Sequence, residues 1–193
     1  MLRTEVQTVQ FKYYWLTLGV LALDHLTKWV VRSRMGLHET IELIPGCLRL
    51  SHLRNTGVAF GLFNDFHSSW KPYFLAAMAV VAVVVIAVYG SRVPPGRRLL
   101  HTALTVTMGG ILGNFVDRLA FGYVTDFVEF HVRESFHWPT FNVADTAISV
   151  GIGLLLLDTV KNPDPSGVGS RTAADGGALA SPGADPPGGA AGE

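Results

Sequence analysis

The chain has 193 residues, of which 49% are hydrophobic and 16% charged, and its formal net charge is zero. This composition is too apolar for an ordinary soluble domain, and the balanced charge gives no indication of a nucleic-acid-binding surface. The single cysteine excludes an intrachain disulfide and a multi-cysteine metal site. We therefore expect a small polytopic membrane protein that is mainly α-helical.

Four apolar windows are long enough to cross a hydrocarbon core, which takes about 20 helical residues. They cover residues 13–31, 73–90, 99–119 and 143–160. The first window is interrupted by Asp24 and Lys28 and is not followed by a small-residue cleavage site, so we expect a retained helix rather than a removed signal peptide. Residues 1–160 are thus predicted to form one membrane domain of four transmembrane helices.

The connecting segments predict the orientation of these helices. Residues 91–98 form a short loop with three arginines, which places this loop and both termini in the cytoplasm. In the first outer loop, residues 40–63 alternate apolar and polar positions, which predicts a small extracytoplasmic β-sheet. Residues 161–193 are rich in Gly, Ala and Pro and are expected to be a disordered cytoplasmic tail.

Polar residues within the apolar windows need a physical reason. Asp24 and Lys28 are four residues apart, on one helical face and in the favourable order for an ion pair. The pair is either purely structural, or Lys28 also reaches a group on another helix. Residues 54–61 contain Asn55 and Gly57 and form either a simple turn or a segment that holds an extended peptide.

The third window ends in a further polar cluster. Asn114, Asp117 and Arg118 are at positions i, i+3 and i+4, so they can form one hydrogen-bonded network. Asp117 also suits an ion pair with its neighbour Arg118. Gly109 and Gly113 form a G-x-x-x-G pattern that favours close approach of another helix.

Two aspartates at the ends of apolar segments are the candidate catalytic residues. Placing an ionisable group at membrane depth costs at least a few kcal/mol, so Asp126 and Asp145 indicate a catalytic role rather than a packing role. The alternative for Asp145 is structural, since Asn142 is a plausible N-cap and Asp145 would lie in the first helical turn. The predicted topology brings both acids to the same side of the membrane.

Five motifs in this order resemble those of the lipoprotein signal peptidases, or signal peptidase II, across roughly residues 13–160. They are Asp24-x-x-Thr27-Lys28, Asn55-x-Gly57-x-Ala59-Phe60, Gly113-Asn114-x-x-Asp117-Arg118, Val124-x-Asp126-Phe127 and Phe141-Asn142-x-Ala144-Asp145. His25 departs from the family, in which glutamine is commoner at this position.

The resemblance implies an aspartic endopeptidase of the bacterial inner membrane with its active site at the extracytoplasmic face. Its substrates would be diacylglyceryl-modified prolipoproteins, cut just before the lipidated cysteine. Its partners would be these substrates and the phospholipid bilayer; we expect a monomer that binds no nucleic acid and needs no metal or cofactor. The resemblance assigns Asp126 and Asp145 as the catalytic dyad, Asn55, Gly57, Asn114, Arg118 and Asn142 as supporting groups around substrate and dyad, and Asp24, Lys28 and Asp117 as structural polar residues.

The sequence also bears on two other functions. A metalloprotease would need a His-Glu-x-x-His helix, which none of the histidines provides. A small proton-coupled transporter or channel is the alternative, with Asp24, Asp117, Asp126 and Asp145 as its relay. A relay needs acids spread through the bilayer, whereas three of these four are predicted on one side.

Overall fold

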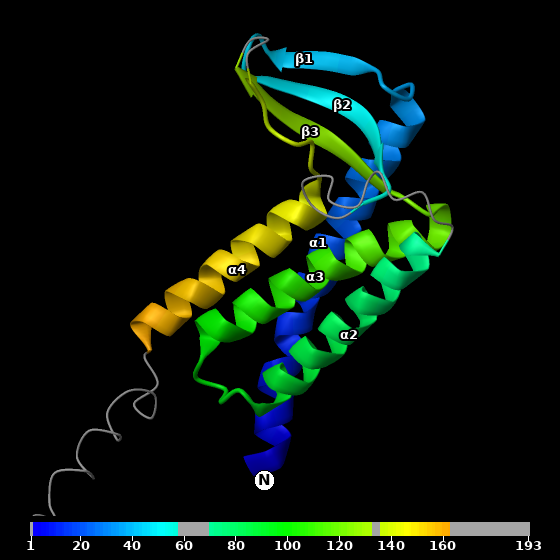
Figure 1. Cartoon of the computed structure of the whole chain (residues 1–193). Coiled ribbons are helices and arrows are strands. Elements are labelled where there is room, and N and C mark those ends of the chain that lie inside the picture. The colour runs from blue at the N-terminus through cyan, green and yellow to red at the C-terminus, as the bar shows by residue number, and fades with distance from the viewer. Residues whose placement is uncertain (1, 58–69, 133–135, 163–193) are drawn as a thin grey trace, which may run out of the picture.

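The computed structural model describes residues 2–57, 70–132 and 136–162, and consists of four long helices beneath a small sheet (Figure 1). The helices are α1 (Leu2–Arg34), α2 (Lys71–Arg92), α3 (Arg98–Phe121) and α4 (Val143–Lys161). They confirm a mainly helical protein with helices over all four predicted windows.

Three helices in the described part of the chain, α2, α3 and α4, are long and apolar enough to cross a membrane. α1 is the longest helix but does not meet this measure, since polar residues such as Asp24 and Lys28 interrupt its apolar sequence. Four spans therefore remain a prediction. The expected tail lies outside the described residues from position 163 on.

α3 is the central helix of the bundle and packs between α1, α2 and α4 (Figure 1). Small residues make this possible. A Cβ added to Gly109 would lie 2.8 Å from Val20 Cβ on α1, one added to Gly110 would collide with the Ala144 carbonyl on α4, and one added to Gly113 would lie 2.5 Å from Asp24 Oδ2. The glycines of the G-x-x-x-G pattern therefore do allow close helix approach.

The sheet is antiparallel, with strand order β1 (Thr40–Ile44), β2 (Leu48–Asn55), β3 (Val124–Val132) and β4 (Phe136–His137). The prediction that the first outer loop supplies the sheet is only half right, because the segment between α3 and α4 supplies its longest strand. An isolated hairpin is marginal in water, so the hairpin of β1 and β2 gains stability because β2 also pairs with β3. Residues 58–63 of the predicted sheet segment lie outside the described residues.

An apolar cluster joins the sheet to the bundle. Val31 in the last turn of α1 and Met35 just after the helix pack against Phe127 of β3, with Leu50 and Val128 of the sheet beside them. This contact fixes β3 against α1 one residue after Asp126. The packing therefore determines where the candidate acid lies relative to the helices.

Candidate active site

Asp126 lies in β3, where the sheet meets the helices. α3 ends at Phe121 and is capped by Gly122, whose φ of 74° gives the left-handed turn that favours glycine, and β3 begins two residues after this glycine. Asp126 is buried, and its carboxyl oxygens accept hydrogen bonds from Asn55 Nδ2 at 2.9 Å and Asn142 Nδ2 at 2.6 Å. Two amides, from β2 and from the start of α4, therefore fix this group.

Asp145 lies in the first turn of α4, and Asn142 is the N-cap of that helix. Asn142 Oδ1 accepts a hydrogen bond from the Asp145 backbone N at 2.9 Å, and Asp145 Oδ2 accepts one from the Asn142 backbone N at 3.3 Å. Asp145 Oδ1 accepts a further hydrogen bond from Asn114 Nδ2 at 2.7 Å. The predicted cap is therefore present, and it holds the carboxylate where the helix dipole favours negative charge.

Asn114 and Asn142 connect the two acids. Asn142 Nδ2 donates to Asp126 Oδ1 and also approaches Asn114 Oδ1 at 3.2 Å, while Asn114 Nδ2 donates to Asp145. Both asparagines are buried, so these bonds are protected from water. The two carboxyl groups thus belong to one hydrogen-bonded unit.

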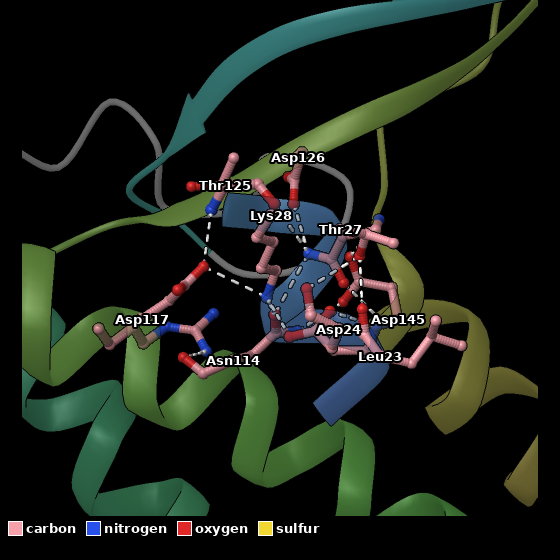
Figure 2. Close-up of polar contacts among 12 residues, drawn as sticks. Leu23, Asp24, Thr27, Lys28, Asn114, Asp117, Thr125, Asp126 and Asp145 are labelled. Atoms are coloured by element: carbon pink, nitrogen blue, oxygen red, sulfur yellow. Dashed lines mark hydrogen bonds and ion pairs between the residues drawn. The ribbon is translucent and has the colours of Figure 1, made fainter. Parts of the chain in front are cut away.

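A buried row of charges lies beside this unit (Figure 2). Lys28 Nζ is 2.7 Å from Asp24 Oδ2, 3.2 Å from Asp117 Oδ2 and 3.0 Å from Asn114 Oδ1, and the side chains of Asp24, Lys28 and Asp117 are fully buried. Asp24 Oδ1 accepts a hydrogen bond from the Ala144 backbone N at 2.9 Å. The predicted Asp24–Lys28 pair therefore exists, and Lys28 also reaches a second helix.

Arg118 does not pair with Asp117, so that prediction was wrong. Adjacent residues of a helix do not face each other. Arg118 instead donates hydrogen bonds to the carbonyl oxygens of Asn114 at 3.3 Å and Gly57 at 3.2 Å, and Gly57 N donates to Asn55 Oδ1 at 2.8 Å. Residues 55–57 are thus held against the end of α3, and the rest of the 54–61 segment lies outside the described residues from position 58 on.

Two residues of this network were missed from the sequence. Arg32 Nη1 lies 3.3 Å from Asp117 Oδ1 and 3.0 Å from Thr125 Oγ1. A signal was present, because Arg32 follows Lys28 by four residues and therefore lies on the same face of α1. Thr125 had no local signal, since its role depends on β3 packing against α1.

The environment of Asp126 favours its protonated form. Burial raises the pKa of Asp126 to about 7, and the charge of nearby Asp145 raises it as well, against the hydrogen bonds from Asn55 and Asn142 and the charge of Lys28. One proton shared by the two acids near neutral pH is the expected state of such a pair. The site can therefore offer an acid and a base together.

All ten residues predicted for the site lie in one connected set of contacts at the sheet end of the bundle. Asp24, Asp117, Asp126 and Asp145 belong to this set. The acid at the other end of α4, Asp158, instead pairs with Arg97. Four acids gathered at one end do not form the relay through the bilayer that a proton-coupled transporter needs.

The fold and the site define a helical membrane protein with an enclosed acid and amide site beneath a small sheet. The family model described as signal peptidase (SPase) II matches residues 16–161. The chain therefore belongs to the signal peptidase II family.

Similar proteins agree with this assignment. The lipoprotein signal peptidase of Symbiobacterium thermophilum is 44% identical over 146 residues, which cover 75% of this chain and 91% of the relative. That of Solibacter usitatus is 40% identical over 153 residues, which cover 79% and 93%. A bacterial membrane enzyme solved by the in meso method has a TM-score of 0.68 at 25% identity, covering 82% of this chain and 94% of its own.

Proposed function

We propose that this protein removes the signal peptide from bacterial prolipoproteins, by hydrolysis on the Asp126 and Asp145 pair. Membership of the signal peptidase II family supports lipoprotein signal peptide cleavage. The observation that carries the dyad is the bridge of Asn142 and Asn114 between buried Asp126 of β3 and half-buried Asp145 of α4. The substrate in this proposal is a diacylglyceryl-modified prolipoprotein, cut just before the lipidated cysteine.

The proposed reaction divides the work between the two acids. Asp145 is assigned as the ionised member, because it lies in the first turn of α4, where the helix dipole favours negative charge. It takes a proton from the attacking water. Asp126, whose raised pKa of about 7 keeps it protonated at lower pH, polarises the scissile carbonyl and helps to protonate the leaving amine. No metal has a part in these steps.

The remaining residues have supporting roles in this proposal. The acids and the extended peptide are oriented by the five supporting residues, Asn55, Gly57, Asn114, Arg118 and Asn142. The buried ion pairs of Lys28 with Asp24 and Asp117 hold α1 against α3. Burial of the site strengthens these electrostatic interactions. The acyl chains of the substrate, held in the bilayer, bring the peptide into position.

The proposed placement is the inner membrane, with α1 to α4 all crossing it, both termini in the cytoplasm and the site at the outer face. The arginine-rich loop between α2 and α3 supports this orientation, since α3 begins there at Arg98 and carries Asp117 towards its other end. Mutual neutralisation of Asp24 and Lys28 lowers the cost of placing α1 in the membrane. We expect the protein to act as a monomer.

Cleavage of a defined substrate tests this function. The purified protein in detergent should cut a diacylglyceryl-modified prolipoprotein before the modified cysteine, as mapped by mass spectrometry, and should leave the unmodified precursor intact. No cleavage of the lipidated form would overturn the function. Equal cleavage of both forms would overturn the requirement for the lipid.

A further inference from the structure

The guanidinium of Arg32 lies where three elements meet. It projects from α1, reaches Asp117 of α3 at 3.3 Å and Thr125 of β3 at 3.0 Å, and lies over the Phe121 ring with 4.6 Å between the guanidinium carbon and the ring centre. The arginine side chain is only 20% exposed. Its planar fork and its aromatic contact therefore fix it in a single position.

Each polar atom of Thr125 has a hydrogen-bond partner. Its hydroxyl oxygen accepts from Arg32, its backbone N donates to Asp117 Oδ2 at 3.0 Å, and its carbonyl oxygen accepts from Asn142 Nδ2 at 3.4 Å. Thr125 has no exposed surface, although its neighbour on the paired strand, Arg54, lies towards solvent. Hydrogen bonds to the hydroxyl, the backbone N and the carbonyl oxygen therefore hold Thr125 in one position and orientation.

Thr125 directly precedes Asp126, which makes this placement relevant to the dyad. Successive side chains of a strand point to opposite faces. Fixing the Thr125 hydroxyl on one face therefore fixes the rotation of β3 about its own axis, and with it the direction of the Asp126 carboxyl group on the other face.

We propose that Arg32 is a positioning residue for the dyad, acting through Thr125 to set the orientation of Asp126. This inference rests on the proposed peptidase function. Arg32 contacts neither carboxyl group of the dyad among the contacts of the described residues, so it acts on turnover without touching the reacting groups.

Steady-state cleavage of the lipidated prolipoprotein tests the proposal with two sets of variants. Arg32→Met should lower kcat about ten- to a hundredfold with KM unchanged, since small displacements of a catalytic group cost up to about a hundredfold. Arg32→Lys, which keeps the charge and loses the fork, should fall between Arg32→Met and the native protein. Arg34→Gln is the matched control, because Arg34 is exposed on the same helix two residues later.

Thr125 variants keep the test valid even if Arg32→Met does not fold. Thr125→Val replaces the hydroxyl with a methyl group and should lower kcat about tenfold at unchanged KM, whereas Thr125→Ser keeps a hydroxyl and should retain a kcat near the native value. In the double variant Arg32→Lys/Thr125→Val, the losses should not add, because both break the same link.

The outcomes separate this proposal from the function on which it rests. The positioning role is supported if the native protein and Arg34→Gln both cleave the substrate, Thr125→Val has a lowered kcat, and Thr125→Ser has a kcat near the native value. Native kcat in both Thr125→Val and Arg32→Lys would overturn the positioning role while the peptidase function stands. The same holds if these variants only lower the melting temperature and leave kcat unchanged. Native protein that does not cleave would overturn both.

Discussion

Substitutions of Asn142 can separate helix capping from catalysis, because its Oδ1 and Nδ2 atoms contact different groups. Oδ1 caps α4 by accepting from the Asp145 backbone N at 2.9 Å, and Nδ2 donates to Asp126 Oδ1 at 2.6 Å. Asn142→Ser keeps a good N-cap but is too short to reach Asp126, whereas Asn142→Ala loses both contacts.

The magnitudes follow from these contacts. Loss of a hydrogen bond to a charged or partly charged group costs about 1.5–3 kcal/mol, which corresponds to about ten- to a hundredfold in kcat if Asp126 orientation limits the reaction. Both Asn142→Ser and Asn142→Ala should therefore lose about ten- to a hundredfold in kcat. Only Asn142→Ala should also lose about 1 kcal/mol of stability through the missing cap.

The pH dependence gives a second readout. The Asn142 hydrogen bond lowers the pKa of Asp126, which burial raises to about 7, so removing it should raise that pKa further. Activity that needs the Asp126 proton declines as the pH rises through this value. The decline in Asn142→Ser should therefore occur at higher pH than in the native protein.

The assay is kcat for the lipidated prolipoprotein from pH 5 to 9, together with the melting temperature in detergent. Asn162→Ser, at the other end of α4, is the control. Native kcat in Asn142→Ser across the whole pH range would refute the bridging role of Asn142. An equal loss of stability in the serine and alanine variants would refute the separation of the two roles.

Three further substitutions test the surroundings of the site. Asp24→Asn should destabilise the protein by about 3 kcal/mol in a denaturant titration, since it leaves Lys28 buried without its nearest carboxylate at 2.7 Å; native stability would contradict a buried pair. Gly110→Ala should lower the melting temperature by the equivalent of about 1–3 kcal/mol because its Cβ would meet the α4 backbone, while Gly153→Ala, with nothing within 4 Å, should be neutral. Glu129→Gln should weaken acid sensitivity. Burial raises the Glu129 pKa, but the hydrogen bonds with Arg49, Ser51 and His137 together outweigh burial and hold the pKa at about 2, so the stabilisation by Glu129 is present above its ordinary pKa of 4.5 and is lost as the pH falls through 2. An unchanged acid-unfolding curve for this variant would contradict that reasoning.

Local patterns predicted the helices and two of the polar contacts well. Apolar windows located all four helices to within a few residues, except that α1 starts at Leu2, far before the predicted residue 13. The i, i+4 spacing predicted the Asp24–Lys28 pair, and the cap pattern predicted Asn142 with Asp145. These features depend on contacts between residues close in the sequence.

Contacts between distant segments could not be read in the same way. The pairing of β3 with β2 brings residues about seventy positions apart together, as in Asn55 with Asp126, and no local pattern specifies that register. The partner of Asp117 was wrong for the same reason, since its cations come from α1. The sequence named the polar residues, but tertiary packing decided which of them meet.

The most direct test of the central claim compares three single variants in cleavage of the lipidated prolipoprotein, with a metal chelator present throughout. Asp126→Asn and Asp145→Asn should each fold and lose kcat by about a thousandfold or more, because either change removes one member of the acid and base pair. Glu42→Gln, which alters an exposed carboxylate of the sheet, should retain native turnover. Near-native turnover in either aspartate variant, or loss of native activity to the chelator, would contradict a metal-free Asp126 and Asp145 dyad.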